Sequence, residues 1–143
     1  MAPYNTYNTH KQYMATLSKI YSDIDFTFTK KPVTGDVALG YDEQAVIRSI
    51  RNLLSTRNYE RPFNPDLGST LNALLFENIS PMTSLAIQNE IKRTISNYEP
   101  RANIKDVVVN SRPDQNAYDV TLSFYIENAT LPTTVTLLLE RNR

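Results

Sequence analysis

The sequence predicts a small α+β domain, because strand patterns and helix patterns occupy separate parts of the chain. Apolar and polar residues alternate near both ends, whereas helical spacing of apolar residues fills the middle. Such segregation is typical of α+β folds with antiparallel sheets and differs from the strand and helix alternation of parallel folds. With 143 residues the chain has the size of one domain. We expect that domain over residues 21–143, after an N-terminal arm or tail over residues 1–20.

The N-terminal region divides into this arm and a predicted hairpin. Residues 1–20 carry several tyrosines and no acidic residue. They are either a disordered terminus or an arm that orders against a neighbour, since tyrosine is enriched in interfaces. Two alternating stretches then flank a turn that contains Pro32 and Gly35. They predict two short strands, with the apolar positions Ile24, Phe26, Phe28, Val37, Leu39 and Tyr41.

Three helices are expected in the middle of the chain. The first covers residues 42–56 with its aspartate as the cap, and the second starts with Asn64 as cap and Pro65 at its first position. The longest begins with a serine and proline at residue 80 and stops before Pro100. Gly68 inside the second helix suggests that something packs close to its backbone. The buried faces are expected to be Val46, Ile50 and Leu53; Leu71, Leu74 and Leu75; and Ile87, Ile91, Ile95 and Tyr98.

Three strands are expected at the C-terminal end, around residues 107–109, 118–126 and 133–140. The turn residues between them predict a C-terminal antiparallel three-stranded meander. In the last stretch, Leu138 breaks the alternation and places an apolar group on the otherwise polar face. A strand with apolar groups on both faces indicates cover from another chain, or a sheet edge extended by strand addition.

Composition argues against several functional classes. The chain has 15 basic and 15 acidic residues, so its zero net charge disfavours nucleic acid and anionic membranes as partners. It has no cysteine, one histidine (His10) and no glycine-rich phosphate loop, so we expect no metal site and no cofactor. The start lacks the pattern of a signal peptide and no apolar run could span a bilayer. We therefore expect a soluble protein.

Carboxylates are the remaining candidates for enzymatic chemistry. Glycoside cleavage needs only an acid and a base or nucleophile, and Glu60, Glu77, Glu90 and Glu99 could supply such a pair. The alternative interpretation is that these are solvated or ion-paired surface groups, which the sequence favours.

Two short segments combine charge with proline. Glu99 ends the longest helix, where a carboxylate opposes the helix dipole unless a cation such as Arg101 meets it. With Pro100 between them, the two side chains form either an exposed ion pair at a helix stop or a rigid polar knuckle that grips a partner. For a motif that grips a partner, Glu99→Ala or Arg101→Ala is expected to leave the fold nearly intact while stopping assembly, because exposed polar substitutions usually change stability little. Arg61 and Phe63, on either side of a proline, form either a similar interface or a loop whose aromatic ring fills the core.

Five segments carry a more specific signal when they are taken together: residues 21–26, 32–36, 61–65 with Gly68, 75–78 and 97–101. In this order and spacing, the chain from about residue 21 onward resembles the gene-25-like family of phage baseplate wedge proteins. That family includes the TssE subunit of type VI secretion. The resemblance implies a structural protein of a contractile tail, located in the virion baseplate and assembled in the host cytoplasm.

The resemblance also implies partners. A family member is present once per wedge, hence in six copies per baseplate, and joins wedge proteins to the tube or its initiator proteins. It offers a template to the first ring of tail sheath protein, whose arms add to the terminal strands. Glu99, Pro100 and Arg101 match the family motif that contacts the helical core bundle of the wedge. Because some members carry a lysozyme-like label, the alternative function is a peptidoglycan-cleaving glycosidase that uses Glu60 or Glu77.

Overall fold

The structure is a computed structural model that describes residues 21–24, 27–127 and 131–140. The described residues contain a two-stranded hairpin, three α-helices and a three-stranded antiparallel sheet, as the sequence predicts. In chain order the elements are β1 (Ser22–Ile24), β2 (Leu39–Tyr41), α1 (Glu43–Ser55), α2 (Leu71–Leu75), α3 (Pro81–Tyr98), β3 (Ala102–Arg112), the 3-10 helix η1 (Pro113–Gln115), β4 (Ala117–Ile126) and β5 (Thr133–Glu140). The predicted arm over residues 1–20 lies outside the described residues.

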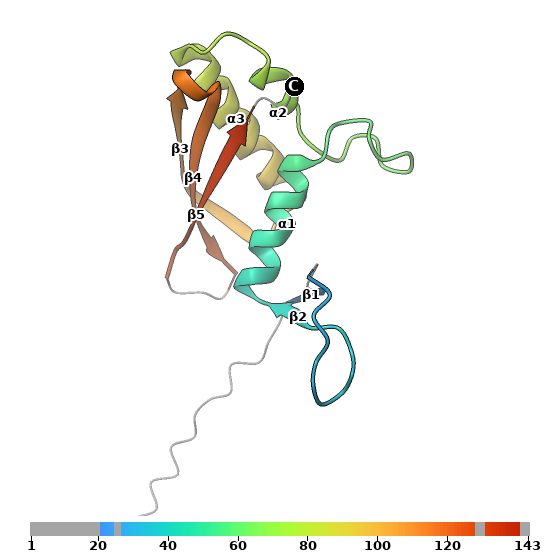
Figure 1. Ribbon diagram of the computed structural model, residues 1–143. Helices are drawn as coiled ribbons and strands as arrows, with labels where there is room; N and C mark the ends of the chain where they lie inside the picture. The colour runs from blue at the N-terminus through green and yellow to red at the C-terminus, as the bar shows by residue number, and fades with distance from the viewer. Residues whose placement is uncertain (1–20, 25–26, 128–130, 141–143) are drawn as a thin grey trace, which may run out of the picture.

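The core lies between the three helices α1, α2 and α3 and one face of the β3-β4-β5 sheet (Figure 1). Ile87, Ile91 and Ile95 are fully buried on α3, at the predicted spacing of four. They belong to the same core cluster as Leu122 and Phe124, which are fully buried on the central strand β4. Because β4 alternates buried and half-buried positions, the sheet has one packed face and one polar face, as expected for an antiparallel sheet.

The long helix α3 begins and ends as its sequence predicts. The Ser80 hydroxyl accepts a hydrogen bond from the Thr83 amide at 3.1 Å, and Pro81 occupies the first turn. The helix ends at Tyr98, so Glu99 becomes its C-cap residue. The strand β3 then starts at Ala102, five residues earlier than the predicted strand at residues 107–109.

The cap of α1 differs from the prediction. Asp42 occupies the N-cap position, but its carboxylate makes no capping bond to α1. Its Oδ1 atom instead accepts a hydrogen bond from the amide of Tyr21 at 3.0 Å, and its own amide donates to the Tyr21 carbonyl at 2.8 Å. The side chain is therefore used to fasten the start of the hairpin onto the helix. The predicted buried face of Val46, Ile50 and Leu53 is confirmed.

The predicted start of the second helix is wrong. Residues 64–70 are not helical, and α2 begins at Leu71 with Thr70 at the N-cap position. Gly68 lies in the preceding loop with a φ of +129°, where a Cβ atom would stand 2.6 Å from the Thr56 carbonyl oxygen. The expectation of a close approach at this glycine is thus confirmed, although the neighbour is a loop backbone. Leu71 and Leu75 are buried as predicted, and Leu74 is partly buried against the core.

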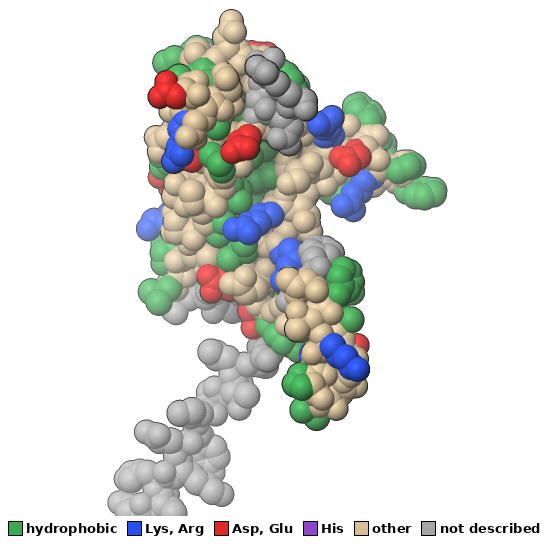
Figure 2. Space-filling view, in the orientation of Figure 1, with side chains coloured by type: hydrophobic (Ala, Val, Ile, Leu, Met, Phe, Trp, Pro, Cys, Tyr) green, Lys and Arg blue, Asp and Glu red, His purple; other side chains and the backbone are tan. Residues whose placement is uncertain are grey.

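Two segments project from the packed body (Figure 1). One is the connection of the hairpin, residues 27–38, which carries an isolated bridge between Lys30 and Val37. The paired strands are shorter than predicted, and Phe26 lies outside the described residues. The other projection is the connection between α1 and α2, residues 57–68, which we call the finger. Figure 2 shows hydrophobic side chains at the end of each projection.

Candidate interaction sites

The residues Glu99, Pro100 and Arg101 lie where α1, α3 and β3 meet. The Glu99 side chain points into the body and is 2% exposed. The Arg101 guanidinium binds it through two parallel contacts, Nε to Oε1 at 2.5 Å and Nη2 to Oε2 at 2.6 Å. The hydroxyl of Ser49 on α1 donates a third hydrogen bond to Oε2. Glu99 therefore ties the end of α3 to the middle of α1.

The charges of this cluster are matched. Burial by itself raises the pKa of Glu99, but the hydrogen bonds from Arg101 and Ser49 and the positive charge of Arg101 outweigh it, so the pKa lies below its ordinary value. The paired carboxylate in turn raises the pKa of Arg101. The positive charge of Arg101 thus also offsets the unfavourable interaction between the Glu99 carboxylate and the negative C-terminal end of the helix dipole.

An aromatic ring covers one part of the outer side of Arg101 and leaves the rest exposed. The ring of Tyr21 lies over the guanidinium, with the Arg101 Cζ atom 5.2 Å from the ring centroid, a cation–π arrangement. The Tyr21 hydroxyl donates a hydrogen bond to Glu127 at 2.8 Å, and this bond raises its pKa. The residue that opens the hairpin thus rests on the motif that follows α3, and Pro100 beside it is exposed.

This geometry corrects one expectation for the motif. One of the two interpretations, an exposed ion pair at a helix stop, is wrong for Glu99, which the structure buries and turns inward because Ser49 and Arg101 hold both of its oxygens. Alanine at Glu99 is therefore expected to destabilise the fold. The part of the motif that a partner could reach is Pro100 and the outer side of Arg101, whose side chain is 31% exposed. Among the described residues, no acceptor is recorded for Arg101 Nη1.

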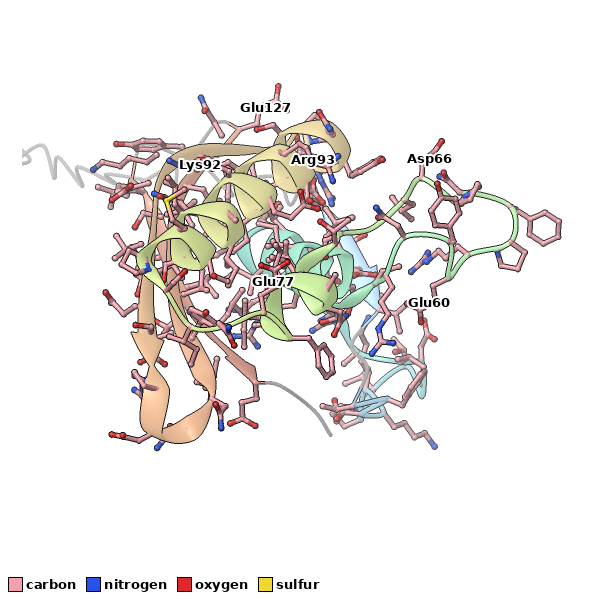
Figure 3. All side chains as sticks on the ribbon, turned by 90° about the horizontal axis from the view of Figure 1, so that it is seen from above. Glu60, Asp66, Glu77, Lys92, Arg93 and Glu127 are labelled. Atoms are coloured by element: carbon pink, nitrogen blue, oxygen red, sulfur yellow. The ribbon has the colours of Figure 1, made fainter. Side chains whose placement is uncertain are left out.

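The segment with Arg61 and Phe63 forms the tip of the finger. Phe63 is fully exposed, so the interpretation that its ring fills the core is wrong. Arg61 is also exposed, and within the described part of the chain it has no ion pair. Figure 3 shows Glu60 and Asp66 on the same projecting loop, away from the packed body.

Leu138 lies on β5, which is an edge strand of the described sheet. Its side chain is 49% exposed, whereas Val135 on the opposite face is buried. A groove of about 920 Å³ runs beside this strand, between Leu138–Glu140 and the end of α1. The base of the finger, Arg57–Glu60, forms part of its wall. The edge strand therefore has an apolar side chain outward and open space next to it.

The carboxylates considered for glycoside cleavage do not form a catalytic pair. Glu60 and Glu77 line different cavities and lie on different parts of the molecule (Figure 3). Hydrogen bonds from Arg93 lower the pKa of Glu90 to about 2, and Glu99 is also held below its usual pKa. A general acid needs a raised pKa, whereas the pKa values of Glu90 and Glu99 are both lowered, so neither residue fits that role.

Several residues of these sites were missed by sequence reasoning. Ser49, Tyr21 and Glu127 join the motif only through tertiary contacts at sequence separations of up to 106 residues. Glu90 was considered only as an acid, yet its Oε1 atom accepts the amide of Thr70 at 2.8 Å and so satisfies the N-terminus of α2 from another helix. No local pattern signals either role.

Residues 21–24, 27–127 and 131–140 contain no cluster of three or more His, Cys, Asp or Glu residues suited to a metal ion. Within the same ranges, none of the helices combines the length and apolar character needed to cross a bilayer.

A family model and a characterised relative that match this chain share one description. The family model described as baseplate wedge protein gp25 matches residues 41–134. The baseplate wedge protein gp25 of Enterobacteria phage T4 is 35% identical over 105 residues, which cover 73% of this chain and 77% of the relative.

Solved structures with the same fold include two of particular interest. A chain of the six-fold symmetrised anti-feeding prophage baseplate is 26% identical, has a TM-score of 0.58, and matches over 86% of this chain and 87% of its own. A Geobacter sulfurreducens protein described as a candidate tail lysozyme has a TM-score of 0.65 at 22% identity, over 71% of this chain and 92% of its own. At that identity the likeness shows the fold alone.

Proposed function

This chain belongs to the baseplate wedge protein gp25 family, and from that premise we propose that it initiates the sheath of a contractile tail. Its broader role is that of a structural component of a phage tail baseplate, where it assembles with other baseplate proteins. The relatives are named for a structural part of the baseplate, which supports a structural and not an enzymatic role. The proposal adds that the chain offers a template to the first ring of sheath subunits.

The observation that carries this proposal is the free edge of β5. In the order β3-β4-β5, one side of β5 pairs with β4 over the whole length of β5. Because β5 is the last strand in this order, its other side has no strand partner among the described residues. An unpaired edge is a ready template for a strand of another chain. The exposed Leu138 offers that strand an apolar contact in the C-terminal half of the edge.

The groove beside β5 provides space for an incoming strand. It is bounded on the far side by Leu54, Arg57 and Asn58, at the end of α1 and the base of the finger. A sheath arm paired with β5 would lie between the sheet and these residues. Main-chain hydrogen bonds would give it affinity, and the groove would select its side chains.

The proposed wedge contact uses a different surface. The exposed Pro100 and the outer side of Arg101 are available to a helical core bundle, while Glu99 holds the guanidinium in place from below. A fixed arginine loses little side-chain entropy when it binds an acceptor. Contacts with the tube or its initiator proteins and a stoichiometry of six are further parts of the proposal. The six-fold symmetrisation of the related anti-feeding prophage baseplate is consistent with that number.

The test is to change β5 without changing the wedge contact. In tails that lack the natural chain and are complemented with variants, Leu138→Lys should give complete baseplates with tubes but at least about 10-fold fewer sheathed tails, because a charge on the edge strand disfavours pairing. Negative-stain electron microscopy counts both products. Val108→Lys is the matched control, since Val108 is similarly exposed on the opposite edge strand, β3. Normal sheaths on Leu138→Lys tails would refute the proposed template.

A further inference from the structure

The finger exposes aromatic surface at its tip and near its base. Phe63 is fully exposed and Tyr59 is 80% exposed, although large aromatic side chains are normally buried at least in part. In the sequence, Phe63 lies between two prolines, Pro62 and Pro65, which stiffen the backbone on either side of it. The exposed ring has no role in the packing of this domain.

Backbone hydrogen bonds nevertheless brace the tip. The Tyr59 amide donates to the Pro65 carbonyl at 2.7 Å, which closes the loop across its base, and the Asn64 amide donates to the Arg61 carbonyl at 3.2 Å around Phe63. Tyr59 itself has a φ of +66°, a conformation that costs free energy for a residue with a side chain. A strained, hydrogen-bonded turn thus presents the Phe63 ring.

The finger is also fastened to the body. The Ser69 amide donates to the Thr56 carbonyl at 2.9 Å, and Gly68 fits against the same carbonyl where no Cβ atom has room. From α3, the hydroxyl of Tyr98 donates to the Asp66 carbonyl at 2.5 Å. The ring is therefore projected in a fixed direction, and binding through it would lose little conformational entropy.

We propose that the finger inserts Phe63 into an apolar pocket of a neighbouring baseplate protein and so anchors this chain in the baseplate. This inference rests on the baseplate role and adds an anchor separate from both the β5 edge and Arg101. A single aromatic ring in a desolvated pocket is typical of an interface hot spot, and the surrounding polar residues form its rim. The pocket must admit one phenyl ring, with Tyr59 at its margin.

Two other occupants are less consistent with the finger. A lipid surface would gain no electrostatic attraction from the finger, because Glu60 and Asp66 balance Arg57 and Arg61 on the same loop (Figure 3). A second copy of this chain would have to take the ring into one of its own grooves, such as the groove beside β5, part of whose wall is the base of the finger. Both remain distinguishable outcomes of the test below.

The test is an incorporation competition between the natural chain and Phe63→Ser. Both are expressed together in cells that assemble tails, and their ratio in purified baseplates is measured by mass spectrometry against their ratio in the lysate. We expect the variant to be depleted about 10-fold or more, because one hot-spot side chain is lost. Thermal melting of the purified variant should match the natural chain, since Phe63 makes no core contact. If the ratio of variant to natural chain were the same in baseplates as in the lysate, the proposal would be overturned.

The matched control is Met82→Ser, which removes a 73% exposed apolar side chain from the first turn of α3. It should be incorporated like the natural chain, and equal depletion of both variants would overturn a specific role for the finger. A photo-crosslinking amino acid at position 63 then identifies the neighbour in assembled tails. A crosslink to another baseplate protein supports the proposal, whereas a crosslink to lipid or to a second copy overturns it.

The outcomes separate this inference from the sheath proposal. If Phe63→Ser is incorporated normally and its tails are sheathed, the finger proposal fails and the template proposal stands. If it is depleted while Leu138→Lys tails keep their sheaths, the anchor stands and the template proposal fails.

Discussion

The two proline-containing segments of this chain, Glu99–Arg101 and Arg61–Phe63, look alike in sequence and differ completely in structure. In the first, the carboxylate is buried and held by a serine and an arginine from separate elements. In the second, the aromatic ring and the arginine are exposed on the finger. The difference is that α1 lies within reach of the first segment, whereas nothing in the described part of the chain lies over the tip of the second.

The comparison separates two uses of a stiff backbone. At Glu99 the proline follows a helix and directs the chain so that a charge can pair inside the fold. At Phe63 the prolines help to display a ring outside it. Variants that disturb each site should therefore divide into those that reduce stability and those that reduce assembly.

The largest effect on stability is expected for Glu99→Ala. It leaves the Arg101 guanidinium without its carboxylate in a partly buried site, which we expect to destabilise the fold by about 3 kcal/mol. Urea unfolding of the purified chain measures the change in the free energy of unfolding. Arg101→Ala should have a comparable effect, and the double variant should cost much less than the sum of the two. A change below about 0.5 kcal/mol would instead place the pair among ordinary surface ion pairs.

A smaller but still clear effect is expected for Gly68→Ala at the base of the finger. The added Cβ atom would meet the Thr56 carbonyl oxygen at 2.6 Å, and the φ of +129° is unfavourable for alanine. We expect a loss of about 2 kcal/mol in thermal or urea unfolding. Gly35→Ala is a useful comparison, because its Cβ atom would meet only the end of a lysine side chain at 3.4 Å. Equal losses in both variants would show that close packing at Gly68 is unimportant.

Glu90 should contribute a pH-dependent part of the stability. Its pKa is lowered from 4.5 to about 2 by Arg93, so its contribution is fully present above pH 4.5 and is lost as the pH falls towards 2. At neutral pH, Glu90→Gln should cost about 1 kcal/mol, because the amide of Thr70 and the guanidinium of Arg93 lose a charged acceptor. The difference between variant and natural chain should shrink between pH 4.5 and pH 2. A difference that stayed constant over this range would contradict the assignment.

The smallest effect on stability is expected for Arg61→Ala. The side chain is exposed and makes no ion pair with the described residues, so unfolding should change by less than about 0.5 kcal/mol. If Arg61 contributes to the rim around Phe63, the same variant should be depleted in the baseplate competition, though less than Phe63→Ser. A marked loss of thermal stability would move Arg61 from the interface to the fold.

Helix α3 and the meander could be predicted because their signals are local. A serine and proline start the helix, a proline ends it, and strict alternation along β4 marks a strand with one buried face. The second helix was placed too early because Asn64 and Pro65 form a good local start signal. In the structure those residues belong to the finger, whose backbone is bonded across the loop to Tyr59 and α3 instead.

The sequence by itself determined the α+β class, the core faces of the helices, the antiparallel meander and the family, since each depends on residue order and spacing. Only the tertiary structure decided that Glu99 turns inward, that Asp42 holds Tyr21 and does not cap α1, and that Phe63 stays outside. The physical reason is that a polar or aromatic side chain forms its most favourable hydrogen bonds or packing contacts with the groups that lie near it in the folded chain. Which partners are within reach depends on how distant segments pack.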